Sequence, residues 1–181
     1  MLRPFLHLLA VVAVATLVGC STTRSTKSTD VSTSIRAALD QAGLKDVSVS
    51  QDRDMGVVTL GGHVAADTEK SQAAFLAKSL AGSQVVANQI AVLPPGNESD
   101  AKKVNSDLDE GIASNLNAAL IQNKLHDSVM YSVKNRAVTL TGEVESQSKR
   151  SQAADVASSV PNVQQVVNEL QVKKQKATSS R

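Results

Sequence analysis

The feature that most constrains this chain is an internal repeat. The segment VTLGGHV at 58–64 returns as VTLTGEV at 138–144, and SQAA at 71–74 returns unchanged at 151–154. Repetition at a fixed spacing indicates that one folding unit has been duplicated. The chain has 181 residues, which is enough for two small domains. The sequence therefore predicts two similar domains in tandem.

Hydrophobic spacing predicts the same order of elements in both copies: helix, strand, strand, helix, strand. The second helix of each copy is predicted to end at Gly82 or Asn162, because these residue types best tolerate the left-handed conformation after a helix. The quoted strands alternate, so every second side chain is predicted to face a core. The predicted inward positions are Val58, Leu60, Gly62 and Val64 in the first copy, and Val138, Leu140, Gly142 and Val144 in the second.

Each of these strands carries a glycine on its predicted inward face. At Gly62 and Gly142 a missing Cβ permits a bulge or the close approach of a helix. The neighbouring residues His63 and Glu143 are predicted to point outward.

The first twenty residues have the pattern of a targeting segment. Arg3 is positively charged, residues 5–18 are apolar, and LVGC follows at 17–20. The apolar run is too short to span a bilayer comfortably, so we predict a cleaved signal peptide. LVGC resembles a bacterial lipobox, in which Cys20 is lipidated and becomes the first residue of the mature chain. The alternatives are a free thiol after an ordinary signal peptide and an uncleaved anchor helix.

Two stretches have the composition of connecting segments. Residues 20–30 are rich in Ser and Thr, which predicts a flexible tether, and PPGNESDAKK at 94–103 predicts a linker between the copies. Each buried acyl methylene contributes about 0.8 kcal/mol, so lipid chains on Cys20 anchor the protein without help from its charge. The predicted segments are the signal peptide 1–19, the lipidated tether 20–30, the first domain 31–93, the linker 94–108, the second domain 109–172 and a basic tail 173–181.

The element order, the VTLTGEV strand with its glycine and the final VVNELQV together resemble the BON domain family of bacterial envelope proteins. With the lipobox, the chain is similar to dual-BON outer-membrane lipoproteins. The resemblance implies an α+β fold of two tandem αββαβ sandwiches, each a three-stranded sheet with two helices on one face. It also implies phospholipid binding and a role in envelope integrity on the periplasmic face of the outer membrane. Ser21 after the cysteine resembles an outer-membrane sorting signal.

The sequence offers little that resembles a catalytic or metal-binding motif. His63 and His126 lie at unmatched positions and make no metal-ligand spacing, so we interpret both as surface residues and predict no metal site. The chain lacks a phosphate loop and a nucleophile elbow, and DRD at 52–54 is typical of a solvated turn. A formal charge of +2 and the scarcity of aromatic residues argue against nucleic acid as a partner. We therefore expect neither an enzyme nor a cofactor.

Differences between the copies give the candidate contact residues. Phe75 aligns with Asp155 and lies about 200° around its helix from Ala73, facing away from the core stripe. Ile121 aligns with Asp40 and is also far from its stripe, with Lys124 and Leu125 following at the predicted helix end. We predict that Phe75, Ile121, Lys124 and Leu125 contact lipid or a partner. Singly exposed apolar residues are the ordinary alternative.

Three functions are compatible with these observations. The first is a lipid-anchored module that binds phospholipid, including anionic phospholipid near the basic tail. The second is a chaperone-like or adaptor protein that binds other envelope proteins. The third is a hydrolase, against which the missing catalytic constellation argues.

Overall fold

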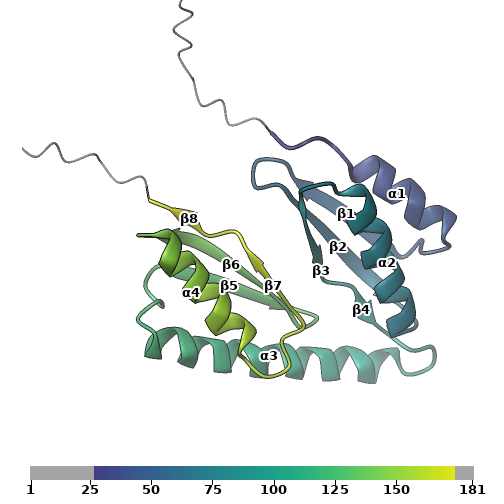
Figure 1. Ribbon diagram of the computed structural model, residues 1–181. Helices are drawn as coiled ribbons and strands as arrows, with labels where there is room; N and C mark the ends of the chain where they lie inside the picture. The colour runs from purple at the N-terminus through teal and green to yellow at the C-terminus, as the bar shows by residue number, and fades with distance from the viewer. Residues whose placement is uncertain (1–26, 174–181) are drawn as a thin grey trace, which may run out of the picture.

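The computed structural model describes residues 27–173, and both copies have the predicted order of elements (Figure 1). The α+β class with two tandem domains is confirmed. Residues 1–19, Cys20 and the tail after Lys173 lie outside the described residues. The first domain contains α1 (Ser32–Gln41), β1 (Val47–Asp52), β2 (Val57–Val64), α2 (Asp67–Leu80), β3 (Val85–Asn88) and β4 (Ala91–Val92). The second contains α3 (Glu98–Gln122), β5 (Val129–Lys134), β6 (Ala137–Val144), α4 (Gln147–Ser158), β7 (Gln165–Asn168) and β8 (Gln171–Val172).

The long middle strand organises each sheet. β2 is antiparallel to β1 and parallel to both β3 and β4, and β6 has the same relation to β5, β7 and β8. The last predicted strand of each copy is therefore two short strands. An asparagine holds the bend between them: the side-chain oxygen of Asn88 accepts from the N–H of Ile90, and that of Asn168 from the N–H of Leu170.

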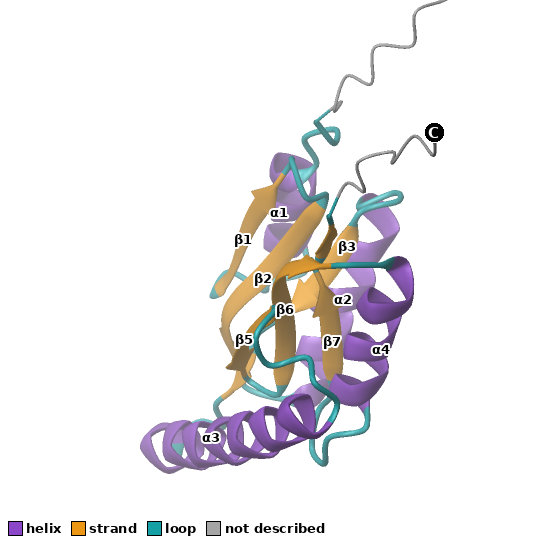
Figure 2. Cartoon of the chain, turned by 90° about the vertical axis from the view of Figure 1, so that its left-hand side faces the viewer, coloured by secondary structure: helices purple, strands orange, loops and turns teal. Residues whose placement is uncertain are grey.

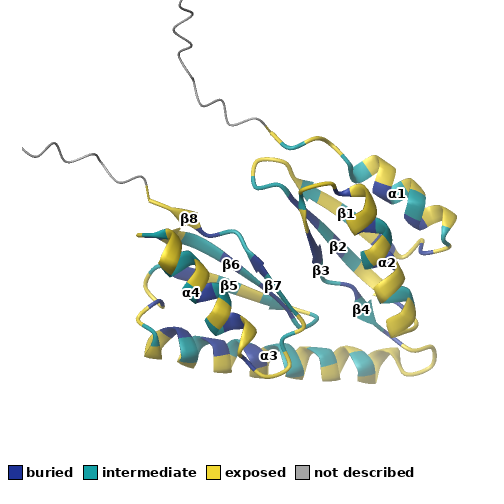
Figure 3. Ribbon diagram, viewed as in Figure 1, coloured by how far each residue is buried: buried dark blue, intermediate teal, exposed yellow. Residues whose placement is uncertain are grey.

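Helices α1 and α2 cover one face of the first sheet, α4 and the C-terminal part of α3 pack on the second, and both cores are mainly aliphatic (Figure 3). Ala73 and Ala77 of α2 are fully buried, so this helix can lie close to the sheet. Leu80, the last residue of α2, is 38% exposed. The predicted left-handed residues after α2 and α4, Gly82 and Asn162, have φ of 63° and 68°. The predicted inward strand residues that are buried are Val58, Leu60, Val64, Val138, Leu140 and Val144.

At the two strand glycines the close approach is made by backbone and not by a helix, which was one of the two predicted reasons. Gly62 and Gly142 have φ of +82° and +117°, and Gly62 is exposed. A Cβ on Gly142 would lie 2.6 Å from the carbonyl oxygen of Ser128, and a Cβ on Gly62 would overlap that of Asp46. These carbonyls precede β5 and β1, so the close approach is by neighbouring backbone. The predicted contact with a helix is wrong.

Most of the predicted linker at 94–108 is helical. Only Pro94 to Asn97 connect the domains, and α3 then runs without a break from Glu98 to Gln122. Acidic residues in its first turn favour the helix through its dipole, and the following Ala and Lys residues have high helix propensity. The segment between the two copies is therefore largely helical, which its composition does not indicate.

The end of the predicted tether belongs to the first domain. The Ser28 N–H donates to the Arg53 carbonyl at 2.8 Å, and Arg53 Nε donates to the Ser28 carbonyl at 2.7 Å. The side-chain amides of Gln51 and Gln84 donate to the Thr29 carbonyl at 2.7 and 3.0 Å. Residues 28–30 thus lie along the β1–β2 turn, and the predicted boundary at residue 31 is too late.

The two sheets meet through the faces that carry no helices. Val57 of β2, Ala87 of β3 and Val167 of β7 are buried in a small cluster, with Met55 packed against it. Helices α1 and α2 lie outside the first sheet, and α4 lies outside the second (Figure 1). Figure 2 shows α3 running along one end of both sheets. The second domain is therefore docked on the first.

Candidate functional site

Gln165, at the start of β7, pairs with the edge of the first sheet. Val85 and Gln89 bond to β2, so the backbone groups of Val86 and Asn88 point out of the sheet. The Gln165 side chain satisfies both: Oε1 accepts from the Asn88 N–H at 2.8 Å, and Nε2 donates to the Val86 carbonyl at 2.6 Å. One amide thus covers an edge that would otherwise be free to pair with another strand.

The β5–β6 turn makes the second polar link between the domains. Asn135 and Arg136 have φ of 49° and 67°, as a two-residue turn of type I′ requires. Both of their N–H groups donate to the carboxylate of Asp109 in α3, at 2.7 and 2.8 Å. Asn135 Nδ2 donates to the Gln89 carbonyl of the first domain at 2.7 Å. Asp109 therefore fixes the turn that reaches across the junction.

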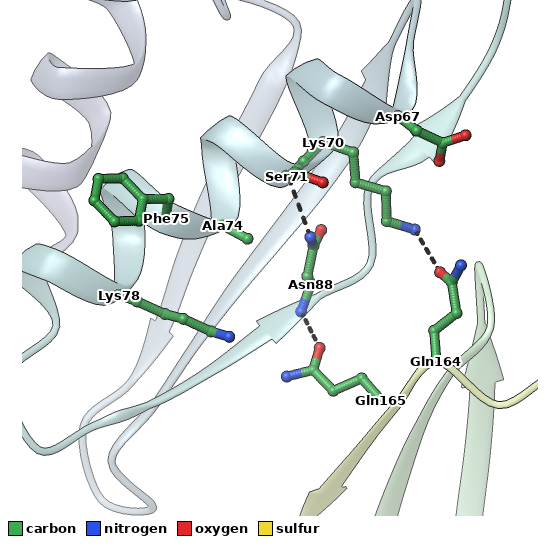
Figure 4. A pocket seen from close by; sticks show the side chains of 9 residues that line it. All are labelled: Asp67, Lys70, Ser71, Ala74, Phe75, Lys78, Asn88, Gln164 and Gln165. Atoms are coloured by element: carbon green, nitrogen blue, oxygen red, sulfur yellow. Dashed lines mark hydrogen bonds between the residues drawn. The ribbon is translucent and has the colours of Figure 1, made fainter.

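An open groove of about 600 Å³ lies between α2 and the start of β7. Lys70 and Lys78 extend from α2 toward the groove, and Asn88 and Gln165 lie between their ammonium groups (Figure 4). Phe75 is on the same helix and its ring points away from Lys70 (Figure 4). The groove is therefore basic and polar inside, with an aromatic ring at its rim.

A smaller hollow of about 140 Å³ shares Asp67, Lys70 and Gln164 with this groove and extends to Arg136. Arg136 Nε is buried and has no hydrogen-bond partner among the described residues. Lys70 therefore stands between the two spaces, with a second cation on its far side.

Lys70 is half-buried and bonds only to neutral oxygens. Its Nζ lies 3.5 Å from the Asn135 carbonyl and 3.4 Å from Gln164 Oε1, at the long end of the hydrogen-bond range. Burial lowers the pKa of Lys70, and the nearby Arg136 charge lowers it further, while Asp67 and Asp109 oppose the shift. Within residues 27–173, no carboxylate forms a salt bridge with Lys70. The groove therefore holds an incompletely compensated positive charge.

The structure does not bring the predicted contact residues together. Phe75 is 72% exposed at the groove, whereas Ile121, 54% exposed, and Lys124, also exposed, lie at the C-terminal end of α3. Leu125 is 1% exposed in the second core, so its predicted contact role is wrong. Its N–H bonds to the Leu120 carbonyl after Lys124 adopts φ of 55°, which closes the helix inward.

Sequence reasoning missed Lys70, Lys78 and Gln165. None belongs to a motif, and each side chain faces outward from its own domain. One signal was available for Gln165: its counterpart in the first copy is Val85, so an apolar strand residue has been replaced by an amide.

Both ends of the described chain lie beside the β1–β2 turn. Ser28 bonds to Arg53 in this turn. Gln171 of β8 lies with its Nε2 3.6 Å from Met55 Sδ in the same turn. In Figures 1 and 2, α3 lies at the opposite end of the molecule. Glu169 also approaches this turn, and its pKa is raised by burial and by the charge of Asp52.

The described residues contain few groups arranged for catalysis. His63 and His126 are both exposed, and no three His, Cys, Asp or Glu side chains between residues 27 and 173 are grouped to hold a metal. Across the same residues, none of the helices has the length and apolar character needed to cross a membrane.

Comparisons with known proteins agree with the repeat. A family profile for the BON domain matches residues 27–94 and again 108–174. Osmotically-inducible protein Y of Escherichia coli (strain K12) is 28% identical over 146 residues, which cover 79% of this chain and 71% of that protein.

Two solved structures of CdsD, a structural protein of the Type III secretion system of Chlamydia trachomatis, are more distant. One covers 81% of this chain and the other, of the C-terminal domain, 80%, both at 14% identity, with TM-scores of 0.35 and 0.33. This chain spans less than two thirds of each, 63% and 66%. Scores this low carry no argument about function.

Proposed function

The chain belongs to the BON domain family, and on this basis we propose that it is a lipid-anchored protein of the bacterial envelope that binds phospholipid with its two docked domains. Cys20 is the proposed point of lipid attachment, and the periplasmic face of the outer membrane is the proposed location. The protein acts by binding and supports outer-membrane integrity without catalysing a reaction.

The observation that carries this proposal is the position of the two chain ends. Residues 28–30 and β8 both lie beside the β1–β2 turn. Lys27 is seven positions after Cys20, and an extended segment of this length reaches about 25 Å at most. The described chain therefore begins and ends at the same end of the molecule, at Lys27, which follows Cys20 in the sequence, and at Lys173, which begins the basic sequence Lys173, Lys174 and Lys176. That end is the one we expect to face the membrane.

Charge supplies only part of the proposed attraction between the protein and the membrane. Each lysine near an anionic surface contributes about 1 kcal/mol. The same end of the molecule also carries the exposed acids Asp30, Asp52 and Asp54, which oppose the attraction. Lys27 and Arg53 at this end offset part of that charge, and Lys27 forms a salt bridge with Asp54 at 3.5 Å. The acyl chains are therefore the main source of membrane affinity, and the basic tail adds a smaller, salt-sensitive component.

A second candidate function is supported by the position of α3. This helix lies at the end opposite to residues 28–30 and β8 (Figure 2). Ile121 and Lys124 are exposed near its C-terminal end and would be directed away from the leaflet that holds the anchor. This arrangement favours a partner protein over the anchoring leaflet as their contact, which corresponds to an adaptor role.

Cys20→Ala tests the anchor. The variant is expected to lose incorporated palmitate and to move from the membrane fraction to the soluble periplasmic fraction, with unchanged circular dichroism. Cys20 is the sole cysteine, so labelling has one possible site on sulfur. A variant that stays in the membrane fraction after a high-salt wash would contradict the assignment of the anchor.

Flotation with liposomes tests phospholipid binding separately. The unlipidated chain with Cys20→Ala is expected to float with vesicles that contain phosphatidylglycerol and less with pure phosphatidylcholine vesicles. Ile121→Asp, which copies the residue at the equivalent position of the first domain, distinguishes the two candidates. Unchanged flotation of Ile121→Asp would favour the adaptor role for that surface, and reduced flotation would favour lipid.

A further inference from the structure

The groove between the two domains contains a charged side chain that its own surroundings do not satisfy. Lys70 has three donors, yet its two bonds are long and end on neutral oxygens. Removing an ammonium group from water is unfavourable unless it is paired, so half-buried lysines normally have a carboxylate or another anion beside them. Among the described residues no carboxylate forms a salt bridge with Lys70, although Asp67 lines the same groove and, with Asp109, partly offsets the lowering of its pKa.

Two other cations, Lys78 and Arg136, add to the positive electrostatic potential at Lys70. Lys78 reaches the groove from two turns further along α2 (Figure 4), and it forms no salt bridge with any residue between 27 and 173. Arg136 lowers the pKa of Lys70 from the adjoining hollow, so its positive charge is felt at the Lys70 ammonium group. Of the two acids that raise the pKa of Lys70, Asp109 is engaged by the two N–H groups of the β5–β6 turn, and Asp67 lines the groove itself.

Neutral polar side chains line the groove beside the two lysines. The Ser71 hydroxyl is one of them, Asn88 lies between the two ammonium groups, and the Gln164 oxygen accepts from Lys70 on the side away from Lys78 (Figure 4). Lysine is a flexible point charge with three donors, so Lys70 and Lys78 can converge on one tetrahedral anion between them. The volume of about 600 Å³ also leaves room for an organic group attached to that anion.

We propose that this interdomain groove binds a phosphate group, with Lys70 and Lys78 as its charged ligands and the exposed ring of Phe75 available to the organic part of a phosphate ester. The site rests on the proposed function only for the source of the phosphate, which is a lipid headgroup or a free phosphate. Both lysines belong to α2 of the first domain, while Gln164 and Gln165 of the second domain line the opposite side of the groove.

The test uses the unlipidated chain with Cys20→Ala and amide NMR. Inorganic phosphate and a soluble short-chain phosphatidylglycerol are each expected to shift the amides of Ser71, Asn88 and Gln164. Lys70→Gln and Lys78→Gln are each expected to weaken binding about tenfold. Lys102→Gln, an exposed lysine of α3 outside the groove, is the matched control and leaves affinity unchanged. Lys70 bonds to Asn135 and Gln164 of the second domain, so Lys70→Gln changes the domain junction as well as the groove. Lys78→Gln tests the groove without removing these bonds.

Phe75→Ser separates the two sources. A lipid headgroup as the source predicts that Phe75→Ser weakens binding of the short-chain phosphatidylglycerol and leaves inorganic phosphate unaffected. Equal affinities for both probes, unaffected by Phe75→Ser, assign the site to a free phosphate. The proposal is overturned if neither probe shifts the groove amides, or if both lysine variants bind as the parent does. These outcomes are independent of fractionation of Cys20→Ala, because the chain tested here has no anchor.

Discussion

In the first domain the segment before the opening helix is extended, and Ser28 bonds through its backbone to the β1–β2 turn. In the second domain the equivalent segment is part of α3, and Asp109 bonds through its carboxylate to the β5–β6 turn. The same contact is thus made by backbone in one copy and by a side chain in the other. Duplication has preserved the position of the contact and changed its chemistry.

A similar contrast recurs along the junction. Gln165 pairs with the edge of the first sheet, whereas its counterpart Val85 is 47% exposed. The β1–β2 turn contains Met55, which packs on the junction, whereas the shorter β5–β6 turn sends Asn135 to Gln89. The cores repeat because each must fill the same space, while residues outside the cores are free to differ. Those differences are what join the copies.

The largest expected effect concerns the strand glycines. Gly62→Ala is expected to lower the free energy of unfolding by about 3 kcal/mol or more, because it adds both a positive-φ strain and an overlap with backbone. Gly142→Ala is expected to cost somewhat less, since its Cβ would lie 2.6 Å from the Ser128 oxygen. Urea unfolding followed by circular dichroism measures both.

Gly43→Ala is the matched control for these variants. Gly43 has φ of +80° with nothing within 4 Å of a built Cβ, so only the conformational cost of about 1 kcal/mol applies. Equal losses for Gly62→Ala and Gly43→Ala would show that the overlap with Asp46 is unimportant.

The second-largest expected effect concerns the contact that Asp109 makes with the β5–β6 turn and Ser28 makes with the β1–β2 turn. Asp109→Ala is expected to destabilise the second domain by about 2 kcal/mol, because hydrogen bonds to a charged group are lost from two N–H donors. Ser28→Ala keeps its backbone bonds and is expected to change stability by less than about 0.5 kcal/mol. Tyr131, the only tyrosine, reports unfolding of the second domain by fluorescence. If Ser28→Ala lost as much stability as Asp109→Ala, the first domain would not hold its turn through backbone bonds alone.

Gln165→Ala tests the edge contact and is expected to weaken docking by about 1 kcal/mol. Hydrogen exchange of the Asn88 amide should accelerate about fivefold, since it loses its acceptor Gln165 Oε1. Val85→Ala, at the equivalent position of the first copy, should leave this amide unchanged. An Asn88 amide that exchanges at the same rate in all three proteins would argue against the edge contact in solution.

A smaller effect concerns the end of the first helix in each copy. Lys124 has φ of 55° where the first copy has Gly43 at 80°. Lys124→Gly is therefore expected to raise the melting temperature, with a gain of about 0.5 to 1 kcal/mol, and Gly43→Lys to lower it by a similar amount. A loss of stability in Lys124→Gly would mean that the lysine side chain makes a contact worth more than its backbone cost.

The smallest effect is a pH dependence. The pKa of Glu169 is raised by burial and by Asp52, so the folded state disfavours its ionised form. Its contribution to stability is present below the ordinary glutamate pKa and is lost as the pH rises through the higher folded value. Glu169→Gln, which copies Gln89 of the first domain, should therefore stabilise at pH 7 by less than about 0.5 kcal/mol after solvent screening, and not at pH 4. An equal gain at both pH values would exclude ionisation as the cause.

The cores were predictable from the sequence because the same spacing of apolar residues occurs in both copies. Leu60 and Leu140 occupy matched inward positions, and both are fully buried. The residues Gly82 and Asn162 also fulfil their predicted left-handed roles. In each case a local rule, either alternation or backbone conformation, is sufficient to determine the outcome.

The junction was not predictable by the same rules. Val57, Ala87 and Val167 lie on the strand faces that point away from their own cores, so alternation assigns them to solvent. Their burial depends on a second sheet, and hence on the three-dimensional arrangement. The proline and glycine at 94–96 do mark a turn, but composition does not reveal that a helix begins at Glu98. The candidate groove follows from the same docking and has no motif of its own.

Relaxation of backbone ¹⁵N nuclei in the unlipidated chain tests most directly the central claim that the two copies form one docked unit. The contacts of Val167 with Val57 and Ala87, together with those of Gln165 and Asn135, predict a single rotational correlation time for the amides of both domains. Two separate and shorter correlation times, each appropriate to one small domain, would contradict the docked arrangement and with it the interdomain groove.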